Sequence, residues 1–484
     1  MQPIGTITMY YPFLDEETRR IMEEIMEKAN NYYDFVGKLK EFVLAEEPTD
    51  LLIYFAIHHS GLLLDIDSYQ EIGRKYSKVP IIQPSLFYVS VLQGNYEHVA
   101  YAHEAVDDFL STNPPVWLAL EMRCLRFEVD LLQYPKTLYN TKNVDEIERI
   151  MKHNPQMEFF YNILYDCYRE RAMRNGDIEE AIQYTKLAIE YAERFNDTVR
   201  LAYHLRTIAD YLQRTNLTEA RQCLLEAHEL MLSLEIPVGI ASTLHHLSRL
   251  DAIRGEYSLS IERNLEAISI RDEVGLSIGV YALMLSTIYN TIGDPESGLD
   301  WARAAELDFE THPGVKPRSI MNQAWSHALL NRRNEALVLL ESVKENVLKS
   351  GMESILAWFY FVNGVLDMMN DEYDSARSYM EEAVDLYEGK SYYENALIFV
   401  HHLALLDVIS EHDSFPWLVF LENKARDEDL PGILGQVLVL KARQLHAYGD
   451  IEALNEVINE VKSIGREPGM RFLIDEVDRI TRES

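Results

Sequence analysis

Small residues recur in this chain at a nearly constant interval, and that interval constrains the fold more than any other feature of the sequence. Six of them follow short polar turns and are separated by 39, 40, 38, 38 and 40 residues: Ala181, Ala220, Ser260, Gly298, Ala336 and Ala376. Periods of about 20 to 50 residues are typical of proteins that stack one small supersecondary motif. The middle of the chain is therefore predicted to be a repeat array.

A second small residue stands seven positions after the first in most of these units. The second residues are Ala188, Ala227, Ala267, Ala305 and Ala383, whereas the fifth unit has Val343. Seven residues are about two turns of an α-helix, so both side chains lie on one stripe of the helix surface. A stripe of small residues predicts that a neighbouring helix approaches closely there.

Each turn is flanked by segments with the periodicity of buried helices. Apolar and aromatic residues recur three or four positions apart before Gly176 and again after Asp371. Pro237, Pro317 and Pro431 mark linkers between units, because a missing backbone N–H discourages continuation of a helix. The repeating unit is therefore predicted to be helix, tight turn, helix and linker.

These units resemble the tetratricopeptide repeat family. The segment Gly176-Asp177-Ile178, followed by Ala181 and Ala188, matches the turn and the small residues of that family most closely, and Gly364 matches its small residue in the first helix. The period exceeds the family's usual length, about 34 residues, by about one helical turn. Longer units of this kind look like the sensor domains of maltose-activator-type regulators and the Rap-type peptide receptors.

The resemblance implies an all-α fold, a right-handed α–α superhelix of stacked helical hairpins. First helices of the hairpins would line its concave face, and concave surfaces of repeat proteins commonly bind peptides.

The pattern divides the chain into four predicted regions. Residues 158–455 carry the regular repeats, and residues 81–157 carry divergent ones with turns near Gly94 and Pro135. Residues 1–80 are predicted to form an N-terminal capping region, and residues 456–484 a C-terminal capping helix. Caps are expected because the terminal apolar faces of a stack must be covered.

Within the N-terminal region two elements are predicted. An extended piece runs from Thr6 to Tyr11, and an amphipathic helix runs from about Glu16 to Asn30.

The charge of the chain argues against two classes of partner. Its 79 acidic and 45 basic residues give a net charge of −34, and such a field repels nucleic-acid phosphates and anionic lipids. Three cysteines without a Cys-x-x-Cys pair, and a start without a secretory signal, indicate a cytoplasmic protein. We expect no direct nucleic-acid or membrane partner.

No catalytic motif is present, so we expect a protein that is not an enzyme and has no cofactor. The sequence contains no Gly-x-Ser-x-Gly, Gly-x-Gly-x-x-Gly or His-Glu-x-x-His pattern. Three pairs of adjacent histidines begin at His58, His245 and His401, but neighbours on a helix diverge by about 100° and do not easily share a metal ion. Since His245 and His401 lie four repeats apart, these pairs are not expected to meet, and we predict no metal site.

Five residues are candidates for the concave binding face: Arg206, His245, Arg249, Trp325 and Phe361. Arg249 follows His245 by four positions, so both lie on one helical face and could hold an acidic or carboxylate group. The alternative for each residue is an ordinary surface position.

Two functions follow from this architecture. The first is a scaffold or adaptor that binds a partner protein or peptide in the concave groove. The alternative is a regulatory sensor module in which a small molecule or peptide alters association with a transcription or signalling partner. Since the sequence shows no DNA-reading helix-turn-helix or ATPase segment, such a sensor would act through another polypeptide.

Overall fold

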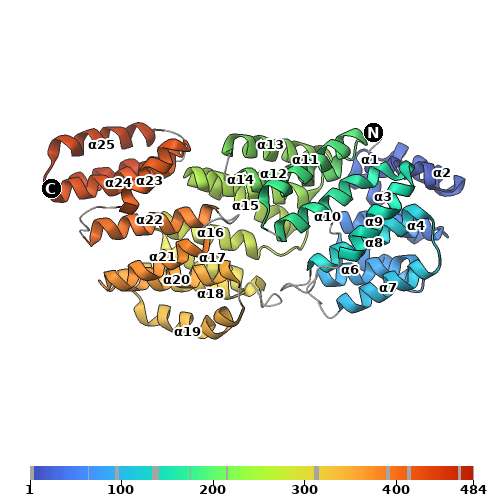
Figure 1. Cartoon of the computed structure of the whole chain (residues 1–484), viewed down its shortest axis with the longest axis horizontal. Helices are drawn as coiled ribbons and strands as arrows, with labels where there is room; N and C mark the ends of the chain where they lie inside the picture. The colour runs from blue at the N-terminus through green and yellow to red at the C-terminus, as the bar shows by residue number, and fades with distance from the viewer. Residues whose placement is uncertain are drawn as a thin grey trace. The chain divides into compact units, whose positions relative to one another are not determined.

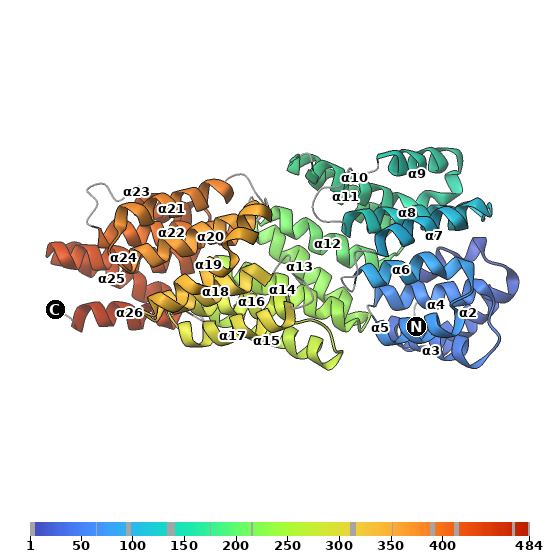
Figure 2. The ribbon, with the colours of Figure 1, turned by 90° about the horizontal axis from the view of Figure 1, so that it is seen from below.

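The computed structural model describes residues 5–63, 65–92, 98–132, 141–174, 176–213, 216–309, 316–350, 352–387, 393–410, 416–466 and 470–482. Over these residues the regular structure is helical, without a strand, which confirms the all-α fold class (Figures 1 and 2). The chain divides into two compact units. Unit 1 comprises Met1–Leu212 and Thr218–Thr243, and unit 2 comprises Gln213–Leu217 and Leu244–Ser484.

The helices of unit 1 are α1 (Gly5–Thr8), α2 (Glu16–Lys28), α3 (Tyr32–Ala45), α4 (Asp50–Leu62), α5 (Ile66–Tyr76), α6 (Gln83–Leu92), α7 (Val99–Ser111), α8 (Val116–Leu132), α9 (Thr141–His153), α10 (Tyr161–Arg174), α11 (Ile178–Arg194), α12 (Thr198–Leu212) and α13 (Leu217–Ser233), with 3-10 turns η1 (Tyr11–Phe13), η2 (Pro80–Ile82) and η4 (Pro155–Phe160).

The boundary between the units falls within α14 (Pro237–Arg254). Unit 2 continues with α15 (Tyr257–Glu273), α16 (Gly279–Thr291), α17 (Pro295–Asp308), α18 (Lys316–Leu329), α19 (Arg333–Ser350), α20 (Glu353–Met368), α21 (Tyr373–Tyr387), α22 (Tyr393–Ile409), α23 (Pro416–Asp427), α24 (Pro431–Tyr448), α25 (Ile451–Ile464) and α26 (Arg471–Arg482).

Helical hairpins stack on one another in unit 2. Helices α16 and α17, α20 and α21, and α24 and α25 pack as pairs. The first helices also contact one another in succession, α16 with α18, α18 with α20, α20 with α22, and α22 with α24 (Figure 2). First helices therefore form one layer, on which side chains from successive hairpins can converge.

The predicted stripe of small residues is buried. Ten of its members expose none of their surface: Ala181, Ala188, Ala220, Ala227, Ser260, Ala267, Ala305, Ala336, Ala376 and Ala383. A Cβ atom added to Gly298 would lie 2.9 Å from Cγ of Asn290 on the preceding helix. The stripe is therefore a packing surface, as its spacing predicts.

The turns within the hairpins have a common backbone conformation. The φ angle lies between 72° and 82° at Gly176, Gly255, Gly293 and Gly449. Glycine adopts this left-handed region without steric cost, whereas a residue with a Cβ atom is strained there. Asn331 in the corresponding turn has φ 60°, and asparagine tolerates this region better than most residues. The recurrence of glycine or asparagine in these turns is therefore explained by the backbone.

The N-terminal segment corrects one prediction. Thr6 to Tyr11, expected to be extended, forms part of α1 and the start of η1. Ile7 and Tyr10 are both buried, and their spacing of three places them on one helical face. Burial in unit 1 thus outweighs the strand preference of the local residues. The helix predicted from Glu16 to Asn30 is confirmed as α2, which ends at Lys28.

This segment lies inside unit 1. Thr6 donates a hydrogen bond of 2.6 Å to the buried carboxylate of Asp197, the residue that precedes α12. The Tyr10 ring makes edge contacts with Phe55, Trp117 and Phe159, at 5.4 to 5.8 Å between ring centroids. The interior of unit 1 is therefore filled by the chain's own N-terminal residues.

Two further features bear on the predicted organisation. The turns expected near Gly94 and Pro135 lie outside the described residues. Among the residues that are described, no helix combines the length and the apolar character needed to span a bilayer.

Candidate ligand pocket

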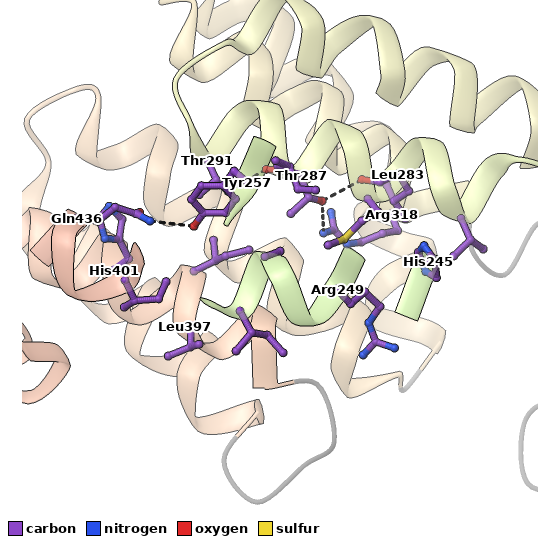
Figure 3. A pocket seen from close by; sticks show the side chains of 17 residues that line it. His245, Arg249, Tyr257, Leu283, Thr287, Thr291, Arg318, Leu397, His401 and Gln436 are labelled. Atoms are coloured by element: carbon purple, nitrogen blue, oxygen red, sulfur yellow. Dashed lines mark hydrogen bonds between the residues drawn. The ribbon is translucent and has the colours of Figure 1, made fainter. Parts of the chain in front are cut away.

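A cavity of about 260 Å³ lies inside unit 2 (Figure 3). Helices α14, α15, α16, α18, α22 and α24 contribute its lining, and most of that lining is apolar. The apolar walls include Ile253, Leu283, Met284, Ile288, Leu397 and Ile433. Helices from distant parts of the sequence thus enclose a single pocket.

Helical spacing explains why each helix supplies several side chains. On α14, His245, Arg249 and Ala252 are separated by four and three residues, which places them on one face. On α22, Leu397 and His401 are four apart and line the same cavity. Each wall is therefore one face of a regular helix.

Near one end of the pocket, α24 meets the turn between α14 and α15. A Cβ atom added to Gly255 would lie 2.5 Å from the Cα atom of Gly432, so the two backbones are in direct contact. Beside this contact, the side-chain amide of Gln436 donates a hydrogen bond of 3.0 Å to the hydroxyl oxygen of Tyr257. These contacts join segments that are far apart in sequence but belong to one compact unit.

His245 is oriented by a chain of hydrogen bonds. The amide nitrogen of Asn264 donates to the carbonyl oxygen of Tyr281 at 2.6 Å, so the Asn264 side-chain oxygen is left as an acceptor. Nδ1 of His245 lies 2.9 Å from that oxygen and therefore carries the proton. The ring also packs on Tyr281, with 4.7 Å between centroids. His245 is thereby fixed in one tautomer and one orientation.

Arg318 adds a second guanidinium to the pocket. Its Cζ atom lies 3.2 Å from the ring centroid of Trp358, and the group donates hydrogen bonds to Asn322 and, at 3.4 Å, to the Thr287 hydroxyl. The stacked ring and these bonds hold the guanidinium at the cavity wall. Figure 3 shows Arg318, Arg249 and His245 toward one side of the drawn pocket.

The opposite side of the pocket is polar but uncharged. Figure 3 shows His401, Gln436 and Tyr257 there. Burial, together with the neighbouring His402 and Arg443, lowers the pKa of His401 to about 3, so the ring is neutral near pH 7. Its Nδ1 atom is buried without a hydrogen-bond partner. A buried polar atom without a partner costs free energy.

The structure separates the five residues predicted for the concave face. His245 and Arg249 line the unit 2 pocket together. Arg206 lies in unit 1, where it donates a hydrogen bond of 2.9 Å to the Ser242 hydroxyl and packs over the Tyr203 ring.

Trp325 and Phe361 lie in the hydrophobic core of unit 2, which corrects their predicted place on an open face. Neither exposes any of its surface, and their ring centroids are 5.1 Å apart. Large aromatic side chains gain more from burial between helices than from exposure to water. A place on the first helix of a hairpin does not distinguish the inner surface of a stack from its core.

Of the seventeen residues that line the pocket, His245 and Arg249 were predicted, and Arg318, His401 and Gln436 are among those that were not. His401 was expected to remain apart from His245, yet both line this pocket. The adjacency of His401 and His402 was the only sequence signal, and it says nothing about distance in space. In the described part of the chain, no cluster of three or more potential metal ligands occurs.

Comparisons with known proteins bear on the fold rather than the pocket. No protein-family model matches the sequence, and none of the curated proteins does. The solved structure of the apo form of RapI has a TM-score of 0.46 and 13% identity, over 84% of this chain and 99% of that chain.

Two other solved structures show weaker likeness. For the apo form of the quorum sensor NprR from B. thuringiensis, the TM-score is 0.41 with 12% identity, over 79% of this chain and 97% of that one. For yeast Tom70, the TM-score is 0.35 with 12% identity, over 98% and 96% of the two chains. The assignment of tetratricopeptide-like hairpins therefore rests on this chain's own repeats, and the resemblance to maltose-activator-type regulators stays a prediction.

Proposed function

We propose that this protein is a non-catalytic binding module in which the pocket of unit 2 receives a ligand and so controls association with a partner protein. The observation that carries the proposal is the pocket itself. Its walls are mainly apolar, and a few polar side chains converge on it, His245, Arg249 and Arg318 among them. This composition is typical of sites for small molecules and chain ends.

The position of the pocket supports regulation in addition to binding. Its walls come both from α14–α16 and from α22–α24, so a bound ligand contacts helices that are far apart in the sequence. A ligand with higher affinity for this arrangement of the helices shifts the population toward it. This argument favours the sensor function over a scaffold of fixed shape.

A protein or peptide partner is compatible with the same pocket. The end of a peptide chain, or one apolar side chain, can enter a cavity of about 260 Å³. We therefore propose a protein or peptide as the partner, with the occupied pocket as the controlling element.

Thermal unfolding of the purified chain with a panel of metabolites and peptides tests the proposal. A ligand of the folded state at about 100 times its Kd stabilises it by about 2.7 kcal/mol, which is readily detected as a rise in Tm. The double variant His245→Ala with Arg249→Ala should lose that rise, while Arg206→Ala in unit 1 serves as the control. If the double variant keeps every ligand response and every partner contact of the parent, the pocket is not the functional site.

A further inference from the structure

The N-terminal segment of unit 1, residues 5–14, is bound across several helical hairpins as a peptide would be. We infer that this segment is a displaceable occupant, and that a partner segment with the same chemistry, a hydroxyl residue and a tyrosine four positions apart, competes with it for the same site. The inference concerns unit 1 alone and does not rest on the pocket of unit 2.

The segment contacts residues that lie far apart in the sequence. The Tyr10 ring packs edge-on against aromatic rings from three elements, and the Thr6 hydroxyl reaches the residue before α12. Helix α4 contacts α6, and α6 contacts α8, so successive hairpins of one stack take part. We call the contacting residues the segment site: Phe55 on α4, Trp117 and Glu121 on α8, Phe159 in η4, and Asp197 before α12. Repeat proteins bind peptide segments on surfaces assembled in this way.

Two hydroxyl groups of the segment bind two buried carboxyl groups. Thr6 donates to Asp197 at 2.6 Å, and Tyr10 donates to Glu121. Asp197 exposes none of its surface, and Glu121 exposes 4%. Burial, and then the charge of Glu121, raise the pKa of Tyr10, so its hydroxyl keeps its proton and remains a donor. Since carboxyl oxygens accept hydrogen bonds and repel acidic side chains, a competing segment needs a hydroxyl donor at both positions.

The backbone hydrogen bonds of the segment stay with it when it leaves. The N–H groups of Tyr10, Phe13 and Leu14 donate to carbonyl oxygens inside the segment. Helix α1 has four residues, and helices this short are marginal on their own. A short turn held to its neighbours by side chains belongs to the low end of the range of opening free energies. Local opening can therefore release the segment while the helices of unit 1 keep their own backbone hydrogen bonds.

The segment site keeps internal partners without the segment. Asp197 also accepts hydrogen bonds from the side-chain amide of Asn162 at 3.2 Å and from the backbone N–H of Arg200 at 3.3 Å. Glu121 also accepts one from the Tyr54 hydroxyl at 3.5 Å. Departure of the segment admits water to both carboxyl groups, and hydration of such groups is favourable. The main cost of opening is then the exposure of apolar surface, which a partner segment covers again.

Fluorescence anisotropy of a labelled peptide with the sequence of residues 5–14 tests the inference on the full chain. A tethered segment competes at an effective concentration on the order of millimolar, so the parent should bind the peptide weakly. The double variant Thr6→Ala with Tyr10→Phe loses both hydroxyl contacts of its own segment. It should bind the unaltered peptide at least tenfold more tightly than the parent does, and a peptide with the same two changes at least tenfold more weakly than the unaltered one.

Tyr11→Phe is the matched control in the chain. Tyr11 follows Tyr10, but its hydroxyl is buried without a hydrogen-bond partner in the described part of the chain. Its removal should change the affinity for the peptide by less than threefold. A tenfold gain from Tyr11→Phe would show that any loosening of the segment admits the peptide, which would overturn the assignment to the two hydroxyl contacts.

Hydrogen exchange of the parent chain gives a second measurement that needs no substitution. An excess of isotopically heavy peptide, which differs in mass from the chain's own segment, should speed exchange over residues 5–14 at least tenfold and leave α8 and α12 protected. Exchange of the segment at the rate of α8 and α12, with and without the peptide, would make it a fixed part of the core and overturn the inference.

Two further outcomes separate the segment site from the unit 2 pocket and from self-association. Added to the double variant Thr6→Ala with Tyr10→Phe, the changes His245→Ala and Arg249→Ala should leave peptide affinity unchanged. Loss of binding there would place the peptide in the unit 2 pocket and overturn the inference. A dimer of the parent chain that the peptide disperses, measured by light scattering, would identify a second copy as the occupant and overturn the partner segment. Failure of the metabolite panel would count against the unit 2 pocket and leave the segment site standing.

Discussion

Gly255 and Gly432 touch through their backbones, although they belong to different hairpins of unit 2. A Cβ atom on Gly432 would lie 2.5 Å from the carbonyl oxygen of Arg254 and 2.7 Å from the carbonyl carbon of Gly255. Real Cβ atoms do not approach backbone so closely, and a backbone cannot rotate away as a side chain can. This contact between the two backbones therefore requires glycine on both sides.

Gly432→Ala is expected to open this contact. Alanine favours a helix over glycine by about 1 kcal/mol, so in the absence of a clash the variant would be more stable. We expect a loss of about 1 to 3 kcal/mol instead, from the forced separation of the two backbones. Urea unfolding measures the loss, and circular dichroism should show unchanged helix content.

Gly37→Ala is the matched control for this prediction. Gly37 lies within α3, whereas Gly432 is the second residue of α24, and a Cβ atom on Gly37 would meet nothing within 4 Å. This variant should gain about 0.5 to 1 kcal/mol. Equal stabilisation of the Gly432→Ala variant would mean that α24 does not touch the Gly255 turn.

Acidification should destabilise the fold through buried histidines such as His402. Burial lowers the pKa of His402 from 6.5 to about 4, and the ring packs on Trp325 and Phe361. Between pH 4 and 6.5 the unfolded chain binds more protons here than the folded chain, so stability is complete above pH 6.5 and falls as the pH drops toward 4. By pH 5 the loss from this one group is about 2 kcal/mol.

His402→Phe isolates that contribution, since phenylalanine keeps a ring among the same aromatic neighbours. As the pH falls from 7.5 to 6 and 5, the free energy of unfolding should decline less steeply for the variant, because the variant takes up nearly one proton fewer when it unfolds. Parallel curves for parent and variant would show that His402 is protonated equally in both states.

Tyr10 and Tyr54 share one buried acceptor and should differ in importance. Both hydroxyls donate to the side chain of Glu121, which is 4% exposed; Tyr10 makes the shorter bond, and Tyr54 makes one of 3.5 Å. Tyr10→Phe leaves a buried carboxyl group with its weaker partner alone, at a cost of about 1 to 3 kcal/mol. Tyr54→Phe should cost less than about 1 kcal/mol. Thermal unfolding of the two variants gives the comparison. Equal losses of stability in Tyr10→Phe and Tyr54→Phe would contradict the greater importance of Tyr10, and hence of the N-terminal segment.

Ala227→Leu tests the register of the small-residue stripe in unit 1. Ala227 on α13 exposes none of its surface, so three additional carbon atoms should overpack the neighbouring helix and cost about 1 to 3 kcal/mol. Gln222→Leu, at an exposed position of the same helix, should change stability by less than about 0.5 kcal/mol. The chemical denaturation midpoints of the two variants give the comparison, and a tolerated Ala227→Leu would contradict the packing role of the stripe.

The local structure was predictable because each signal acts within one hairpin or between neighbours. The turn at Gly176 needs positive φ, and Ala181 and Ala188 need a close helix partner. Both requirements can be recognised from residues that are close together in the sequence. His245 and Arg249 could be placed on one face for the same reason, since a spacing of four is a property of a single helix.

The segment Thr6 to Tyr11 shows where such signals fail. Its local residues favour an extended chain, but Ile7 and Tyr10 gain more from burial in unit 1. Trp325 shows a related limit, because a helical stripe looks the same whether it faces a groove or a core. In both cases the deciding contacts come from residues distant in sequence.

The amino-acid sequence by itself determined the repeating hairpin, its turns and its tight helix contacts, since these depend on a few residues at fixed spacing. Only the tertiary structure decided that Arg318 and His401 share a pocket with His245, and that Gly432 contacts Gly255. The physical reason is that each hairpin turns slightly relative to the last. Over several hairpins these small rotations add up and bring α24 back to the α14–α15 turn. The residues of a single repeat therefore do not predict this contact.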